Sequence, residues 1–105
     1  MFILENTVQC VMSLSVTAPQ VPVNQFTHVA CTYDGTTISL YINGALVATA
    51  SGGAALGAGN SNGVVIGGNS PNGDQLIGTI DQLRVWNTAR TAAQVCVASG
   101  AAGCP

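Results

Sequence analysis

Few side chains in this sequence could carry out chemistry. Its 105 residues include four carboxylates, one histidine, two arginines and no lysine. Hydrolysis of a glycosidic bond needs two carboxylates that flank the bond, but Glu5 lies near the start of the chain and Asp34 stands in a predicted turn. No predicted strand carries a closely spaced carboxylate pair, and the spacing places no nucleophile and acid beside His28. We therefore predict that the chain is not an enzyme.

The four cysteines are Cys10, Cys31, Cys96 and Cys104. None of them forms a C-x-x-C pair, and a single histidine offers little more, so a zinc–thiolate site is not expected. Three disulfide connectivities are possible. The favoured one joins Cys10 to Cys31, on strands that could be neighbours, and Cys96 to Cys104, which closes a short C-terminal loop. Four buried free thiols are the alternative.

Three aromatic side chains could contribute to a binding site. Tyr33, Tyr41 and Trp86 each have a flat ring that could stack on a sugar. Because aromatic residues in strands more often fill cores or sheet faces, packing is the first interpretation for all three. The sequence therefore names no ligand-binding residue.

Alternation of apolar and polar residues predicts the elements that hold these side chains. Residues 8–16 alternate cleanly and indicate one strand with a buried face. Three further strands are predicted at 27–33, 38–42 and 46–50. They are separated by Asp34-Gly35 and Asn43-Gly44, dipeptides that accept the positive φ angles of tight hairpin turns. These strands should form an up-and-down antiparallel meander.

The pattern is more broken in the second half of the chain. A loop rich in Gly, Ala, Ser and Asn is predicted at 51–63, a short strand at 64–66 and a second loop at 69–74. A long last strand is expected over 76–86, with a bulge at 81–82 because its apolar residues change face there. A helix of one or two turns is expected over 91–97, with its N-cap at Thr88 or Thr91.

Four sequence motifs occur in an order that resembles a known family. They are F-T-H-V-A-C-T-Y-D-G at 26–35, L-Y-I-N-G at 40–44, V-I-G-G at 65–68 and G-T-I-D-Q-L-R-V-W-N at 78–87. Over about residues 24–95 the chain is similar to laminin G-like domains of the concanavalin A-like jelly-roll class. The resemblance implies an all-β antiparallel β-sandwich, shortened at its N-terminus. It leaves the function open, since this fold hosts many activities.

The resemblance also implies roles for individual residues. In the family, the aspartate of the G-x-I-D motif sits where some members hold calcium, and here that residue is Asp81. Calcium takes about six to eight oxygen ligands, which Asp81 alone does not supply, so it could instead cap backbone N–H groups at the bulge. Asp74 could bind calcium in its loop, although turn formation suits it better. Family members that are not enzymes also have histidine at the position of His28, which implies a structural imidazole.

Composition narrows the class of protein. Hydrophobic residues make up 48% of the chain and charged residues 6%, with a net charge of −2. The chain can therefore form a core, but it has no electrostatic attraction for nucleic acid. No apolar run approaches the ~20 residues that span a bilayer, so membrane insertion is not expected. Residues 1–105 are predicted to form one domain, and the even number of cysteines suggests an extracellular or cell-surface protein.

Two classes of function remain. One is a recognition or adhesion module that binds a glycan or a protein; the other is a structural subunit that assembles with itself into an oligomer or filament. A shortened sandwich would leave sheet edges and an apolar face uncovered, so we expect identical copies or a host polypeptide to complete it. Aromatics and amides clustered on an exposed face would favour the first class, and large apolar contacts between molecules the second.

Overall fold

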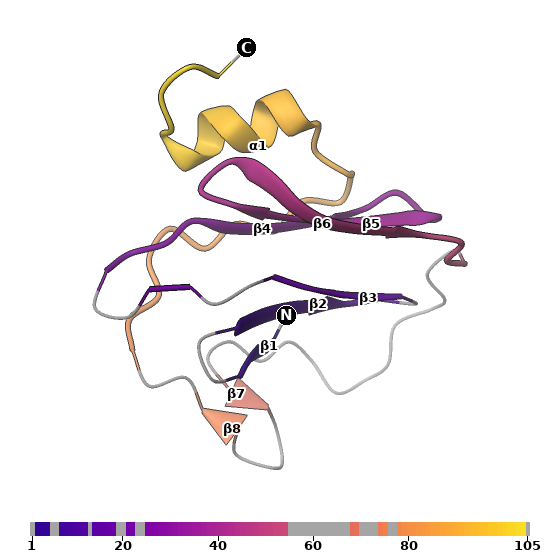
Figure 1. The fold of residues 1–105 in the computed structure, drawn as a ribbon, viewed down its shortest axis with the longest axis horizontal. Helices are drawn as coiled ribbons and strands as arrows, with labels where there is room; N and C mark the ends of the chain where they lie inside the picture. The colour runs from indigo at the N-terminus through magenta and orange to yellow at the C-terminus, as the bar shows by residue number, and fades with distance from the viewer. Residues whose placement is uncertain are drawn as a thin grey trace.

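Two three-stranded antiparallel sheets lie face to face in the computed structural model of this chain (Figure 1). The first contains β1 (Phe2–Leu4), β2 (Thr7–Val11) and β3 (Ser15–Thr17); the second contains β4 (Val29–Tyr33), β5 (Thr37–Ile42) and β6 (Ala45–Ser51). The two layers confirm the antiparallel β-sandwich predicted from the sequence. The structure describes residues 2–4, 7–12, 14–18, 21–22, 25–54, 68–69, 74–75 and 78–104.

The region predicted as a single strand over 8–16 folds as two strands. Cys10 pairs with Val16 in the antiparallel ladder between β2 and β3, so the chain reverses between them. At the reversal, the N–H of Met12 donates to the carbonyl oxygen of Leu14 (2.7 Å). The prediction was wrong because no glycine, asparagine or proline marks the turn, while the alternation continues on both sides of it.

Both predicted hairpin turns are present in the second sheet. Asn43 (φ 50°) and Gly44 (φ 83°) adopt consecutive positive φ angles between β5 and β6, as an Asn-Gly hairpin turn requires. Between β4 and β5 a single residue, Gly35 (φ 99°), has a positive φ angle. The pairing of β5 with β6 shifts register between Leu40 and Tyr41, which marks a bulge that the sequence did not indicate.

The core lies between the two sheets. Its fully buried side chains come from the facing strands of both layers: Val8 and Cys10 of β2, and Ile38 and Leu40 of β5. The Cys10–Cys31 disulfide crosses this core from β2 to β4, with a Cα–Cα separation of 6.2 Å. This is the pairing favoured by the sequence, although the two strands face each other across the layers rather than lying side by side in one sheet.

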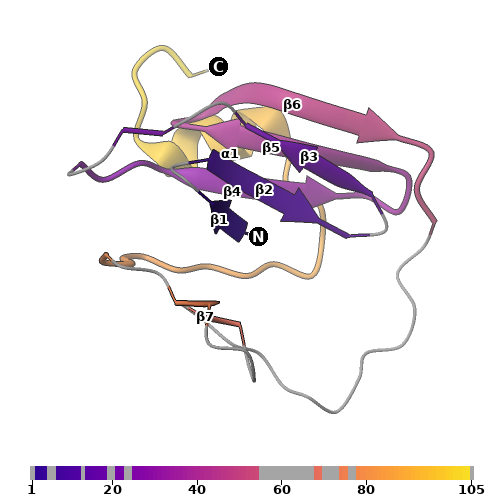
Figure 2. The same cartoon turned by 60° about the horizontal axis from the view of Figure 1, so that its bottom comes forward.

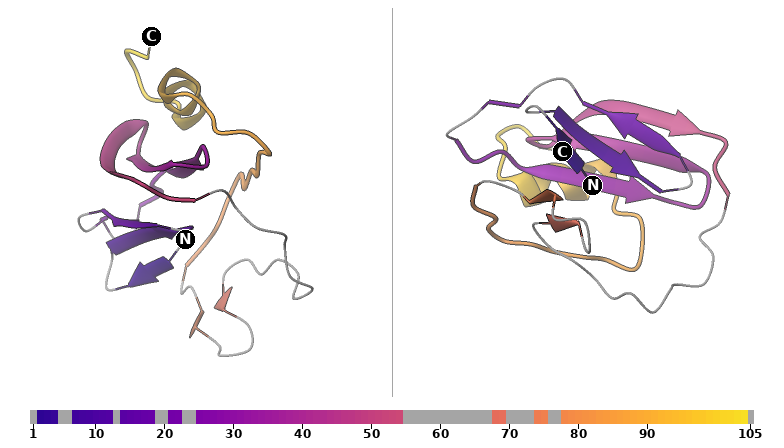
Figure 3. Two further views of the ribbon diagram at one scale, coloured as in Figure 1. Left: turned by 90° about the vertical axis from the view of Figure 1, so that its right-hand side faces the viewer. Right: turned by 90° about the horizontal axis from the view of Figure 1, so that it is seen from below.

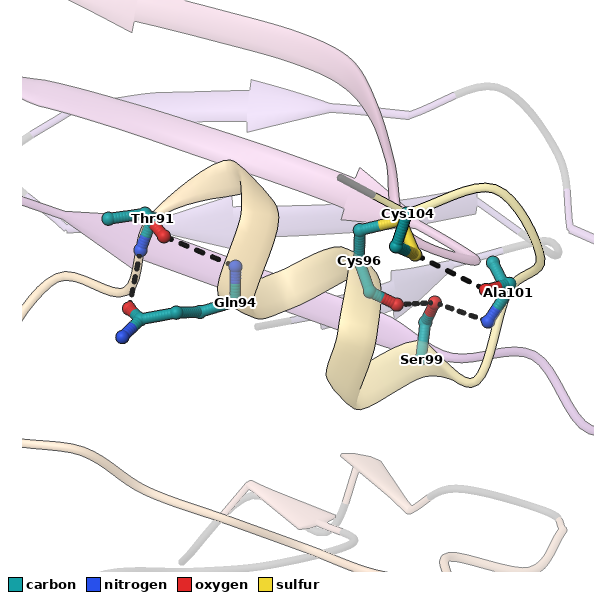
Figure 4. Close-up of a disulfide and its surroundings, with 6 residues drawn as sticks. All are labelled: Thr91, Gln94, Cys96, Ser99, Ala101 and Cys104. Atoms are coloured by element: carbon teal, nitrogen blue, oxygen red, sulfur yellow. Dashed lines mark hydrogen bonds between the residues drawn. A yellow bond between two sulfur atoms is a disulfide. The ribbon is translucent and has the colours of Figure 1, made fainter.

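Helix α1 (Ala92–Ser99) forms a third layer on the outer side of the second sheet (Figures 1 and 3). Its N-cap is Thr91, one of the two candidates from the sequence, and the helix extends two residues beyond the predicted end. Thr91 Oγ1 accepts the N–H of Gln94 (3.1 Å), and Gln94 Oε1 accepts the N–H of Thr91 (3.0 Å) (Figure 4). This reciprocal capping box satisfies two backbone donors at the start of the helix.

Segment 78–90 is not a strand, so the last strand predicted over 76–86 is wrong for its described part, residues 78–86. The segment runs outside the two sheets, on the side of β4, and leads up to α1 (Figures 2 and 3). Gln82 adopts a positive φ of 53° where the bulge was expected, and this kink interrupts the extended backbone. Apolar side chains along the segment are consequently exposed, Val85 by 85%.

The remaining elements are short. A two-stranded ladder joins β7 (Gly68–Asn69) to β8 (Asp74–Gln75), where the sequence predicted a loop over 69–74. The predicted strand at 64–66 and most of the predicted loop at 51–63 lie outside the described residues.

Candidate functional site

A groove opens between segment 84–90 and helix α1, with a cavity volume of about 360 Å³. Its walls are Arg84, Trp86 and Arg90 from the segment and Ala93, Gln94, Val97 and Ala98 from the helix. We call it the arginine groove, because it holds both arginines of the chain. The chain has no lysine, so these two side chains are its only permanent cations.

Trp86 forms the aromatic part of the arginine groove. The Arg90 guanidinium carbon lies 4.0 Å from the centroid of the Trp86 ring, in a cation–π contact. Trp86 is nevertheless 53% exposed, so the packing role predicted for it is wrong. The same prediction holds for the other two aromatics: Tyr41 is buried and Tyr33 packs against the core.

The polar side chains of the arginine groove are hydrogen-bond donors. Gln94 Oε1 already accepts the N–H of Thr91, and the Gln94 amide NH₂ adds two donors. Arg84 and Arg90 have guanidinium donors and no acceptor. No carboxylate lines the groove among the described residues. The groove thus combines an exposed indole with donors from three side chains.

Three features fix the ends of α1 and its position on the sheet. Its capping box fixes the first turn, and the Cys96–Cys104 disulfide ties its last turn to the C-terminal residues, with a Cα–Cα separation of 5.6 Å (Figure 4). This is the second pairing favoured by the sequence. Gly44 approaches the helix so closely that a Cβ there would lie 2.5 Å from Ser99 Oγ. The β5–β6 turn therefore sets the position of the helical wall.

Asp81, the predicted calcium ligand, lies outside the arginine groove on an exposed part of segment 78–90. Its Oδ1 accepts the N–H of Gln82 (2.8 Å) at the kink, which is the local capping role considered for it. The described residues contain no cluster of three or more His, Cys, Asp or Glu side chains. One exposed carboxylate supplies few of the roughly six to eight oxygens that calcium takes, so the described side chains favour the capping role, and calcium binding at Asp81 stays an untested prediction.

We accordingly expect the melting temperature to be the same in calcium and in a chelator such as EDTA. Asp81→Asn should also melt within a degree or two of the parent, because an asparagine oxygen can accept the same N–H from Gln82. Differential scanning calorimetry measures both. A rise of several degrees with calcium in the parent, absent from Asp81→Asn, would contradict this account.

The other candidate residues also lie outside the arginine groove. Asp34 Oδ1 accepts the N–H groups of Thr37 (2.8 Å) and Thr36 (2.9 Å), and these bonds hold the pKa of Asp34 below its usual value. Asp34 is thus a turn residue. The side chains of Glu5 and Asp74 lie outside the described part of the chain.

The backbone of His28 is hydrogen-bonded to Asn43, whereas one ring nitrogen of its side chain is buried without a partner among the described residues. Its N–H donates to Asn43 Oδ1 (2.9 Å), and its carbonyl oxygen accepts the N–H of Asn43 (2.8 Å), which ties β4 to the β5–β6 turn. The ring Nδ1 is buried with no hydrogen-bond partner among the described residues. Burial, together with the positive charge of Arg84, lowers the pKa of His28 and so favours the neutral imidazole.

Sequence reasoning missed Arg84, Arg90 and Gln94. A signal for two of them was available, because both arginines flank the single tryptophan of the chain within one short stretch. The contribution of Gln94 comes from the docking of α1, which no local pattern reveals.

Comparisons with known proteins agree with this architecture. The profile of a laminin G family, described as the concanavalin A-like lectin/glucanases superfamily, matches residues 6–96. A crystal structure of an S-layer domain-containing protein (residues 221–444) from Clostridium thermocellum ATCC 27405 is similar, with a TM-score of 0.65 and 25% sequence identity. The match covers 82% of this chain and 45% of that one, so the chain spans less than half of the solved domain.

Comparison with curated proteins gave no match. Within the part of the chain that the structure describes, no helix has the length and apolar character needed to cross a membrane. Since the family profile covers nearly the whole chain and the structure is a two-layer antiparallel sandwich, the protein belongs to the concanavalin A-like lectin/glucanase superfamily.

Proposed function

We propose that this chain is a non-catalytic recognition module of an extracellular or cell-surface protein, and that it binds a glycan in the arginine groove. The observation that carries the proposal is the exposure of Trp86 beside donors from Arg84, Arg90 and Gln94. A pyranose ring has a flat C–H face that packs on an indole, and hydroxyl oxygens around its rim that accept hydrogen bonds.

The setting of the groove supports a binding role. Small-molecule sites usually combine apolar walls with a few placed polar groups, and here Ala93, Val97 and Ala98 supply apolar surface between the donors. The two disulfides suit an oxidising, extracellular compartment. The similar solved structure comes from an S-layer domain-containing protein, which is in keeping with a place at the cell surface.

The absence of catalysis is part of the proposal. Glycoside hydrolysis uses one carboxyl group as an acid and a second as nucleophile or base. The described wall residues of the arginine groove include no carboxylate and no histidine. Asp34 and Asp81 each accept backbone N–H groups elsewhere. The chemistry available at the groove is therefore hydrogen bonding, stacking and charge pairing.

Replacement of Trp86 by alanine should remove most of the glycan affinity. Truncation of a tryptophan that anchors a ligand weakens binding by about 2 kcal/mol or more, which is roughly thirtyfold. Affinity electrophoresis through gels that contain soluble polysaccharides measures this change in mobility.

Phe26→Ala is the matched control for that experiment. Phe26 is also an exposed aromatic, at 71%, but it does not line the arginine groove. Its removal should leave polysaccharide retardation unchanged. Equal retardation of the parent and Trp86→Ala, or no retardation of the parent in any polysaccharide of a broad panel, would count against the proposal.

Self-assembly is a second candidate function, favoured by a specific observation. Ile80, Leu83 and Val85 expose apolar surface along segment 78–90, and burial of such surface between copies or against a host polypeptide stabilises by about 25 cal/mol per Å². Light scattering at micromolar concentration distinguishes the two cases. A dimer or larger species that dissociates in Leu83→Ser would support assembly, and a monomer would leave only recognition.

A further inference from the structure

We infer that the glycan recognised by the arginine groove is acidic, namely a polymer of sugars that carry carboxylate groups. The inference rests on the proposed function and adds the chemical class of the ligand. A neutral sugar offers hydroxyl groups, each of which both donates and accepts hydrogen bonds. The side chains of the groove offer mainly donors, from Arg84, Arg90 and Gln94, and a carboxylate is an acceptor-only partner that matches them.

The distribution of charge favours the same ligand. The chain as a whole has a net charge of −2, yet both of its arginines line this one groove and no described wall residue is acidic. The described residues also provide no ion pair to either arginine within the groove. An anion that enters here would meet two guanidinium groups that have no ion-pair partner among the described residues, and guanidinium–carboxylate hydrogen bonds are among the stronger ones in proteins.

The two arginines are held differently, which divides their roles. Arg90 lies over one face of the Trp86 ring, 4.0 Å from its centroid, so its charge is fixed against that face and a sugar would stack on the opposite one. For Arg84 the described residues show no such aromatic contact, and its charge acts instead on His28, whose pKa is lowered by burial and by this charge. A sugar ring that stacks near Trp86 would bring its own carboxylate within reach of Arg90, and Arg84 could pair with the carboxylate of a neighbouring unit in the polymer.

The exposed indole favours an acidic sugar over an acidic peptide. A uronic acid unit carries a flat C–H face and a carboxylate on the same rigid ring, so stacking and charge pairing occur together. A glutamate or aspartate side chain has the carboxylate without a comparable flat face. Trp86, half exposed beside the guanidinium groups, would then contribute little to peptide binding.

The test compares polygalacturonate with its methyl ester, which has the same sugar rings but carries uncharged methyl esters in place of the carboxylates. We expect polygalacturonate to bind at least tenfold more tightly in isothermal titration calorimetry at low salt. Its affinity should fall as salt rises from about 0.05 to 0.5 M, because the Debye length shortens from roughly 14 to 4 Å.

Arg84→Gln should weaken the binding of polygalacturonate by roughly tenfold to a hundredfold. Arg84→Lys should weaken it by less, since lysine keeps the charge and loses the fork of donors.

A second variant controls for net charge. Arg84→Gln combined with Ser15→Arg restores the overall charge, with the new cation at an exposed position of β3 in the first sheet, away from α1. It should bind as weakly as Arg84→Gln alone. Recovery of affinity would mean non-specific attraction and would overturn the inference. Circular dichroism melts of each variant confirm that the fold is intact.

The outcomes separate this inference from the function on which it rests. If both probes bind equally well and Trp86→Ala abolishes both, the glycan site stands and the acidic ligand is wrong. If poly-glutamate binds as tightly as polygalacturonate and Trp86→Ala has no effect, the ligand is an acidic peptide and both proposals fail. Tight binding of dextran sulfate but not of polygalacturonate would assign the site to sulfate groups and would overturn the choice of carboxylate.

Discussion

Removal of the Cys10–Cys31 disulfide, in the double variant Cys10→Ala/Cys31→Ala, should lower the free energy of unfolding by about 2–5 kcal/mol. This bond links the two sheets across the core, and its cysteines are 21 positions apart in sequence. Closing a loop of that length restricts the unfolded chain by roughly 3 kcal/mol in the chain-entropy view. Loss of the buried sulfur of Cys10, which is 1% exposed, adds a packing defect.

The matched control is Cys96→Ala/Cys104→Ala. This second disulfide closes a loop of only eight positions at the C-terminal end of α1, so the same entropy model gives roughly 2.5 kcal/mol, with no core defect. Urea unfolding followed by circular dichroism measures both variants. A loss below about 0.5 kcal/mol for the Cys10–Cys31 variant, or four alkylatable thiols in the unreduced parent, would contradict the role given to this bond.

Gly44→Ala should destabilise the protein by about 2–4 kcal/mol and weaken glycan binding as well. Alanine at a left-handed φ of 83° is strained by about 1–2 kcal/mol. Its Cβ would also lie 2.5 Å from Ser99 Oγ and 3.2 Å from the Cα of Cys96. Ser99 has little freedom to move, because its hydroxyl donates to the carbonyl oxygen of Cys96 and accepts the N–H of Ala101 (Figure 4). The helix itself must shift, and the helical wall of the arginine groove shifts with it.

Gly35→Ala isolates the contribution of the helix. Gly35 also has a positive φ, 99°, but a Cβ there would meet no atom within 4 Å. In this variant the free energy of unfolding should fall only by the backbone strain of about 1–2 kcal/mol, and the affinity for polysaccharide should be unchanged. Equal destabilisation of both variants in urea, with equal binding, would show that the close approach of Gly44 to α1 does not hold the groove in place.

The turns, the disulfides and the helix start were predictable because each depends on local chemistry. Asn43-Gly44 tolerates the positive φ angles of a tight turn wherever it occurs, and Thr91 with Gln94 three residues later is a capping box readable from sequence. The disulfide pairs could be favoured from strand and loop positions, although the sequence did not reveal that Cys10–Cys31 spans two sheets.

The errors arose where tertiary contacts decide the structure. The alternation over 8–16 is the same for one continuous strand and for two strands joined by a turn. Only the pairing of Cys10 with Val16 in the structure reveals the turn. Segment 78–86 has the composition of a strand, but a strand requires a hydrogen-bonded neighbour, and the kink at Gln82 interrupts it. The arginine groove exists only because that segment leads to α1, and it could not be inferred from any one stretch of residues.

The most direct test of the glycan site uses the fact that Trp86 is the only tryptophan of the chain. Its fluorescence, excited near 295 nm where tyrosine hardly absorbs, therefore reports on the arginine groove alone. Titration with an oligogalacturonate should give a saturable change in intensity or emission maximum, with the same dissociation constant that calorimetry measures. Heat of binding without any change in Trp86 fluorescence would place the ligand elsewhere on the protein. The absence of both signals would show that the protein does not bind this ligand.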